Sequence, residues 1–147
     1  MNRFLFLSTA ALFTLSLCSC GAKSGGPSDI DPDAPTELSE TESGLKYRIL
    51  RKSDGIKPTA ANEVTVDYTG WLDDGTIFDT SYGRAESTSF RLAGVIPGWT
   101  EGMQLIGEGG MIELEIPAEL GYGELEQPGI PANSTLHFKV ELHRVSR

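Results

Sequence analysis

The sequence predicts an α+β domain in which one short helix packs against a twisted antiparallel sheet. After Gly44, apolar and polar residues alternate over most of the chain, as in strands with one buried face and one solvated face. Only the segment that begins at Pro97 spaces its apolar residues as a helix does. At 147 residues and 39% hydrophobic content, the chain is long and apolar enough for one domain with its own core.

Alternating segments predict the strands. Four clear segments cover residues 45–49, 64–69, 112–116 and 136–143, and a shorter one covers residues 89–92. Asp73-Asp74-Gly75 is typical of a tight turn, and residues 107–110 predict another. The turn explains the two neighbouring carboxylates better than a catalytic pair does, because adjacent strand residues point to opposite faces.

The predicted helix has clear signals at both ends. Pro97 suits its first turn, and Trp99, Met103 and Ile106 follow at i, i+4 and i+7. Gly107 marks its end, so we expect a helix of about 10 residues with one apolar stripe.

Residues 1–19 predict a lipoprotein signal peptide. Arg3 precedes an apolar run over residues 4–17, which is shorter than the roughly 20 residues of a transmembrane helix. Leu17-Cys18-Ser19-Cys20 resembles the end of a bacterial lipoprotein signal, with Cys20 as the lipidated residue. An ordinary secretory signal, with Cys18 and Cys20 as a local pair, is the alternative.

Residues 20–43 predict a lipidated cysteine followed by a disordered acidic tether. Past Cys20 the segment has almost no large apolar side chain, and six acids accompany one base, Lys23. Burial of such a segment offsets little of its ordering entropy. We therefore expect the folded domain to span residues 44–147, with the tether as a spacer or a passive tail.

Composition argues against several classes of function. A net charge of −9 without a basic cluster disfavours nucleic-acid binding. Two cysteines near the N-terminus and two histidines, His137 and His143, predict neither a metal site nor a cofactor. Both histidines fall on the polar face of the last predicted strand, where we expect solvated side chains. No nucleophile motif is present.

Aromatic residues are the remaining candidates for a site. Tyr68, Phe78, Trp99, Tyr122 and Phe138 occupy predicted inward positions or lie beside Gly and Pro loops. Core packing explains this pattern, and so does a pocket with apolar faces and a few polar contacts. Both interpretations stay open on the residues alone.

Several ordered motifs narrow this choice. They are Val66-Asp67-Tyr68-Thr69-Gly70, DGTIFDTS at 74–81, VIPGWTEG at 95–102, Ile116-Pro117, LGYG at 120–123 and NSTL at 133–136. Together they resemble the FKBP-type peptidyl-prolyl cis/trans isomerases, in particular the secreted bacterial branch, over about residues 45–146. The resemblance implies a curved antiparallel sheet of five or six strands wrapped around one short helix.

The resemblance also implies a substrate pocket. Its expected residues are Tyr68, Phe78, Asp79, Arg84, Val95, Ile96, Trp99, Tyr122, Ile130 and Phe138. Trp99 would form the floor beneath the substrate's proline ring. Phe78, Val95 and Phe138 would form the walls.

Polar groups complete the implied pocket. The backbone N–H of Ile96 and the hydroxyl of Tyr122 would hold substrate carbonyls. Asp79 would lie near the rotating bond, oriented by Tyr68 and Arg84. Tyr68, Phe78, Asp79, Tyr122 and Phe138 are the expected catalytic residues, and the others are expected to bind substrate.

The implied activity is rotation of X-Pro bonds in exported, folding proteins, without covalent chemistry and without a cofactor. Expected partners are proline-containing segments and macrolides such as tacrolimus or rapamycin. We expect a monomer in the cell envelope, held by its lipid, with the outer membrane favoured. The alternatives are a non-catalytic, chaperone-like or partner-binding module, and a structural lipoprotein with Trp99 sealed in its core. Thr88 and the loop at 124–133 depart from the family pattern.

Overall fold

The computed structural model describes residues 30–146, so the predicted signal peptide and Cys20 lie outside the described residues. Its strands form one antiparallel sheet in the order β1-β2-β6-β7-β3-β4, and β5 also pairs with β3. The strands are β1 (Ser39–Glu40), β2 (Lys46–Arg51), β3 (Glu63–Trp71), β4 (Ile77–Thr80), β5 (Thr88–Arg91), β6 (Met111–Ile116) and β7 (Leu136–Ser146). One helix, α1 (Pro97–Met103), and two 3-10 turns, η2 (Leu92–Gly94) and η3 (Ala118–Leu120), complete the described elements.

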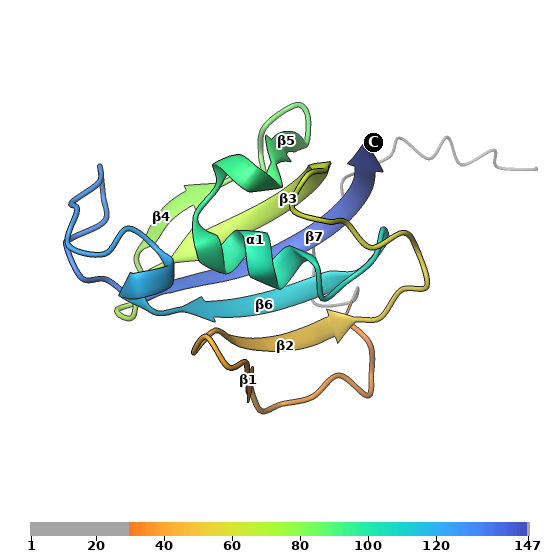
Figure 1. Ribbon diagram of the computed structural model, residues 1–147, viewed down its shortest axis with the longest axis horizontal. Helices are drawn as coiled ribbons and strands as arrows, with labels where there is room; N and C mark the ends of the chain where they lie inside the picture. Colours follow the sequence, from red (N-terminus) through yellow and green to blue (C-terminus); the bar gives the residue numbers. More distant parts are fainter. Residues whose placement is uncertain (1–29, 147) are drawn as a thin grey trace, which may run out of the picture.

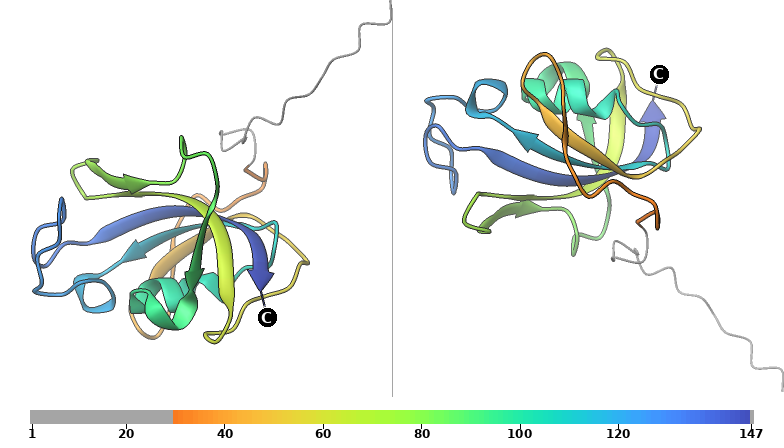
Figure 2. Two further views of the ribbon diagram at one scale, coloured as in Figure 1. Left: turned by 90° about the horizontal axis from the view of Figure 1, so that it is seen from above. Right: turned by 90° about the horizontal axis from the view of Figure 1, so that it is seen from below.

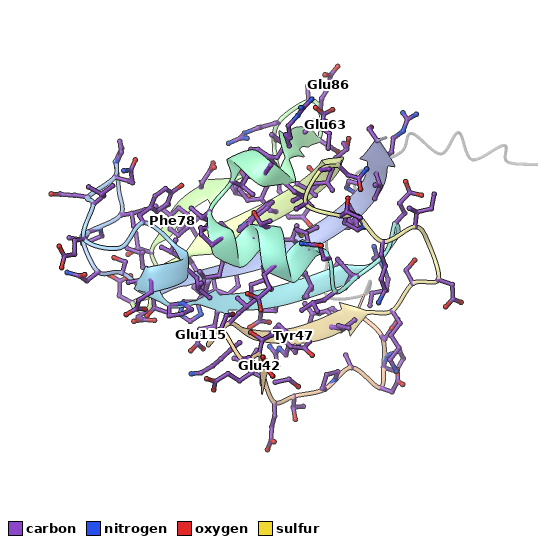
Figure 3. All side chains as sticks on the ribbon, in the orientation of Figure 1. Glu42, Tyr47, Glu63, Phe78, Glu86 and Glu115 are labelled. Atoms are coloured by element: carbon purple, nitrogen blue, oxygen red, sulfur yellow. The ribbon has the colours of Figure 1, made fainter. Side chains whose placement is uncertain are left out.

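The predicted α+β fold with one short helix is confirmed. The sheet curves, and α1 lies across one of its faces (Figures 1 and 2). Side chains of β6 and β7 that face the helix, including Leu114 and Val140, are fully buried in one continuous core. Exposed acids such as Glu63 and Glu86 lie at the periphery (Figure 3).

The sheet has two strands that alternation did not predict, β1 and β4. β4 pairs with residues 69–71 of β3, and β5 pairs with residues 63–66 of the same strand. Loop 81–87 therefore interrupts one edge of the sheet between two short strands. The turn before β4 agrees with the prediction: the Gly75 N–H donates to the Leu72 carbonyl over 2.8 Å, and Gly75 has φ +82°.

Helix α1 is shorter than the predicted 10 residues. Regular α-helix ends at Met103, after which Gln104 N–H donates to the Glu101 carbonyl and Leu105 N–H to the Gly102 carbonyl. These i to i+3 bonds tighten the last turn into 3-10 geometry. Ile106 still reaches the core, with 3% exposure, so the apolar stripe continues beyond the helix itself.

Two glycines let α1 approach the sheet closely. A Cβ at Gly98 would lie 2.5 Å from Ile116, and one at Gly102 would lie 2.6 Å from Leu114. Both neighbours are fully buried on β6, so a Cβ at either glycine would displace side chains of the core.

We expect Gly102→Ala to lower the free energy of unfolding by about 1 kcal/mol, although alanine favours helix formation. Overpacking costs about 1–3 kcal/mol, which outweighs the gain in propensity of about 1 kcal/mol. Urea unfolding measures the change. Gly94→Ala is the matched control, since a Cβ there meets nothing within 4 Å. A Gly102→Ala protein more stable than wild type would contradict this packing.

Residues 30–43 correct the prediction of a disordered tether. β1 pairs with β2, and the Asp31 N–H donates to the Leu50 carbonyl over 2.8 Å. Asp33 forms an ion pair with Lys52 at 3.1 Å. Backbone pairing to an open sheet edge and ion pairing by its acids hold this segment in place. The prediction of disorder came from composition, which indicates only how much apolar surface a segment can bury. Residues 20–29 lie outside the described part.

The histidines agree only in part with the prediction of solvated side chains, because His143 is exposed whereas His137 is half-buried. His137 Nε2 lies 2.7 Å from Asp73 Oδ1, and the imidazole stacks on Trp71. His143 Nε2 lies 2.9 Å from Oδ2 of buried Asp67. Both lie on the polar face, as predicted, but each has a carboxylate partner. Within residues 30–146, no helix has the length and apolar character required to cross a membrane.

Candidate functional site

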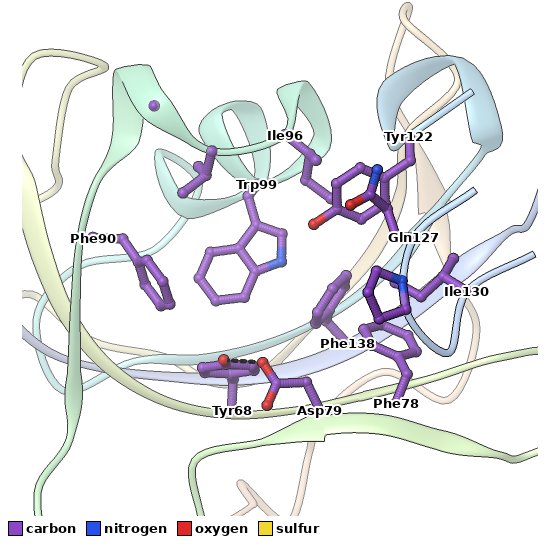
Figure 4. Close-up of a pocket in the computed structure, with 13 residues that line it drawn as sticks. Tyr68, Phe78, Asp79, Phe90, Ile96, Trp99, Tyr122, Gln127, Ile130 and Phe138 are labelled. Carbon is purple, nitrogen blue, oxygen red and sulfur yellow. Dashed lines mark hydrogen bonds between the residues drawn. The ribbon is translucent and has the colours of Figure 1, made fainter. Parts of the chain in front are cut away.

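A hollow of about 500 Å³ opens between α1, β3, β4 and the loop before β7 (Figure 4). We call it the aromatic hollow. It is lined by Tyr68, Phe78, Asp79, Phe90, Gly94, Val95, Ile96, Trp99, Tyr122, Gln127, Pro128, Ile130 and Phe138. These residues come from five separate parts of the chain, which the curved sheet brings to one end of the helix.

The rings around Trp99 stand nearly perpendicular to its indole. Tyr68 and Phe138 each have centroids 5.3 Å from that of Trp99, at interplanar angles of 89°, and Phe90 lies at 5.5 Å and 75°. Phe78 in turn meets Phe138 edge to face at 5.5 Å. Such edge-to-face contacts are favourable and fix each ring against its neighbours. Trp99 is 4% exposed, yet it lines the hollow as well as packing in the core.

Asp79 is the charged group that lines the hollow. The Tyr68 hydroxyl donates to its Oδ2, and Arg84 Nη2 donates to its Oδ1 over 2.6 Å. Burial, and then the hydrogen bond to Asp79, raise the pKa of Tyr68 to about 12. Tyr68 is therefore a neutral donor at any ordinary pH, and Asp79 is held from two sides.

Two of the polar groups expected to hold substrate carbonyls have no hydrogen-bond partner among the described residues. They are the backbone N–H of Ile96, just before α1, and the hydroxyl of Tyr122. The Ile96 carbonyl, in contrast, accepts from the N–H groups of Trp99 and Thr100. A free N–H beside an apolar hollow is a ready donor for a ligand carbonyl.

Titration of Tyr68 predicts loss of stability at alkaline pH. The unfolded chain releases a tyrosine proton near pH 10, whereas folded Tyr68 keeps it until about 12. Its contribution is fully present below pH 10, and the free energy of unfolding falls between pH 10 and 12. We expect Tyr68→Phe to remove about 1 kcal/mol of this fall, once solvent screening is allowed for.

Urea unfolding at pH 9 and at about pH 11.5 measures that change. Tyr82, whose pKa burial also raises to about 12, leaves a residual slope in the variant. An equal fall in wild type and Tyr68→Phe would contradict the assignment.

The structure brings together every residue of the predicted pocket except Arg84, which does not line the hollow and instead binds Asp79 from outside it. Four lining residues were missed: Phe90, Gly94, Gln127 and Pro128. The predicted strand at 89–92 includes Phe90, so its alternation could have indicated this residue. Gln127 lies in a loop with no regular spacing of apolar residues. Among residues 30–146, no three acidic, histidine or cysteine side chains gather as metal ligands do.

A short helix on a curved antiparallel sheet, with an indole-based aromatic hollow at its N-terminal end, agrees with the fold and pocket that the resemblance to the FKBP-type isomerases implies. Residues 54–143 match the family model described as FKBP-type peptidyl-prolyl cis-trans isomerase. The chain belongs to this family.

Similar proteins agree with that assignment. FkpA of Escherichia coli is 53% identical over 102 residues, which are 69% of this chain and 38% of that protein. Outer membrane protein MIP of Legionella longbeachae is 43% identical and aligns over 71% of this chain and 46% of its own length. The crystal structure of E. coli FkpA superposes with a TM-score of 0.73 at 49% identity, covering 76% of this chain and 53% of that one.

The chain thus spans about half, or less, of the curated relatives it matches. One solved structure is matched almost completely: AtFKBP13 is covered over 99% of its chain, with a TM-score of 0.67 and 31% identity over 75% of this chain.

Proposed function

We propose that this chain catalyses cis/trans isomerisation of X-Pro bonds in exported proteins, through its aromatic hollow and without covalent chemistry. One observation carries the proposal. A hollow of about 500 Å³ is walled by rings perpendicular to Trp99, and the unpartnered N–H of Ile96 lies beside it.

The physics of the reaction suits such a site. Resonance gives the peptide bond a rotational barrier of about 18–20 kcal/mol. At the twisted midpoint the resonance is lost and the carbonyl oxygen carries less negative charge. A water-poor apolar site therefore disfavours the planar ground state more than the twisted state. A 10⁴-fold acceleration requires about 5–6 kcal/mol of this difference.

The proposed roles follow the positions of the side chains. Trp99 supports the proline ring, and Phe78, Val95 and Phe138 exclude water from its sides. Ile130, which belongs to the loop before β7, closes the wall on that side.

Polar groups would hold the peptide while one bond turns. The Ile96 N–H and the Tyr122 hydroxyl donate to carbonyls that flank the proline. Asp79, held by Tyr68 and Arg84, presents negative charge beside the rotating bond.

Exchange NMR on a short peptide with one X-Pro bond tests the proposal with the full chain. We expect catalytic amounts of protein to raise the isomerisation rate well above background, and tacrolimus to compete with the peptide. Peptide binding with a rate equal to background would contradict the proposal and favour a chaperone-like or partner-docking module.

We also propose a location in the cell envelope, with Cys20 as the lipid-bearing residue and the chain acting as a monomer. The resemblance of residues 17–20 to a lipoprotein signal supports the anchor, and one relative is named an outer membrane protein. Cys20→Ala is expected to abolish incorporation of labelled palmitate and to move the protein from the membrane to the soluble fraction. Unchanged labelling would contradict the anchor.

A further inference from the structure

A second hollow of about 420 Å³ lies beside the aromatic hollow. It is lined by residues of η2, of α1 and of the positions just after each of them: Ala93, Val95, Pro97, Thr100, Glu101 and Gln104. Val95 lines both hollows, so the two adjoin each other at this residue. We call the second one the helix hollow.

The polar groups of the helix hollow are engaged by the protein itself. Thr100 Oγ1 donates to the Leu92 carbonyl over 2.6 Å, and Gln104 Nε2 donates to the Thr100 carbonyl over 2.8 Å. Glu101 Oε2 accepts from Ser43 Oγ over 2.6 Å. What remains for a ligand is an apolar surface with one carboxylate among its lining residues.

Three residues of the helix hollow, Ala93, Val95 and Pro97, present an apolar surface. Ala93 and Pro97 are exposed, and Val95 is half-buried between them. An occupant that covers these three residues removes apolar area from water, which is favourable. Because Glu101 is the one ionised group in the lining, an occupant with a positive charge is favoured over one with a negative charge.

Ile96 connects the two hollows. It lines the aromatic hollow, and its neighbours Val95 and Pro97 both line the helix hollow. A peptide carbonyl held by the Ile96 N–H would therefore lie at the boundary between them. An extended chain advances about 3.3 Å per residue, so the next two or three residues of the same polypeptide are within range of the helix hollow.

We propose that the helix hollow binds the two or three residues that flank the X-Pro bond on one side, and that it prefers an apolar residue followed by a basic one. This rests on the proposed isomerase function. It adds a second subsite, so clients are selected by flanking sequence as well as by the proline itself.

Three peptides test the subsite with the full chain: a core with one X-Pro bond, the core with Leu-Lys added before it, and the core with Leu-Lys added after it. Exchange NMR gives kcat/KM, and calorimetry gives the binding affinity. We expect one extension to raise both by about 5–10-fold and the other to change neither, because only one flank enters the helix hollow.

Two variants fill the helix hollow. Ala93→Trp and Gln104→Trp each introduce a bulky ring at an exposed lining residue. Both are expected to abolish the gain from the extension and to leave kcat/KM for the core peptide unchanged. Ala60→Trp is the matched control, since Ala60 is exposed and lines neither hollow, and it should keep the gain.

The charge preference has its own test. Replacing Leu-Lys by Leu-Glu is expected to weaken binding about threefold, and Glu101→Gln should remove that difference. Equal binding of the two peptides to wild type would contradict the preference for a basic residue.

Three results would overturn the subsite. They are no gain from either extension, equal gains from both, or a gain that survives Ala93→Trp and Gln104→Trp. Failure of the proposed function looks different, because then the core peptide is not turned over at all. In that case the affinities of the three peptides still decide whether the helix hollow takes the flank.

Discussion

Phe78→Ala is expected to lower kcat/KM for a short proline peptide by about 10–100-fold while the fold stays intact. The Phe78 ring forms one wall of the aromatic hollow and is half-buried in the absence of substrate. Its loss admits water beside the peptide bond. Burial of such a ring is worth about 1.5–3 kcal/mol, which corresponds to the expected fall if most of it acts at the twisted state.

Ile77→Ala is the matched control for this prediction. Ile77 precedes Phe78 on β4 and is 60% exposed, so its side chain points away from the hollow. We expect its kcat/KM to equal that of wild type. Equal losses in the two variants, or none in Phe78→Ala, would contradict the role of the wall.

Gly70→Ala is expected to damage both activity and stability. Gly70 lies behind the aromatic wall on β3, where a Cβ would lie 2.6 Å from Phe78 Cζ and 2.7 Å from Phe138 Cε1. Phe78 can tilt outward, but Phe138 is 5% exposed and packs on Trp99, so its shift disturbs the floor. We expect a loss of about 1–3 kcal/mol in the free energy of unfolding and at least a tenfold fall in kcat/KM.

A double-mutant cycle separates this clash from a general weakening of β3. Phe78→Leu shortens the side chain that the new Cβ would meet, so Gly70→Ala should cost less stability in that background. Urea unfolding of the four proteins gives the coupling free energy. Strictly additive losses would show that Gly70 does not act through the aromatic wall.

Much of the fold could be predicted from the alternation of apolar and polar residues, because a strand with one buried face has apolar residues at every second position. Ile112 and Leu114, or Phe138 and Val140, could be assigned to the core from their alternation alone, and each is buried. The pocket residues needed the additional information of the family motifs. Tyr68, Trp99 and Phe138 belong both to the core and to the hollow. The spacing of apolar residues therefore could not distinguish core packing from lining a pocket.

What the sequence did not predict depends on pairing between distant segments. β4 has four residues and becomes a strand by pairing with the end of β3. Residues 30–43 are ordered by the open edge of β2, although their own composition is typical of disorder. Gln127 enters the lining through the conformation of its loop.

We propose that the aromatic hollow turns a prolyl amide by excluding water, with no proton transferred. Tyr68 stays neutral because its pKa is about 12, and Asp79 is held by two donors. The most direct test is the ratio of kcat/KM in H₂O to that in D₂O for one proline peptide. We predict a ratio close to unity. A ratio of about 2 or more would show that a proton is transferred in the rate-limiting step and would contradict this proposal.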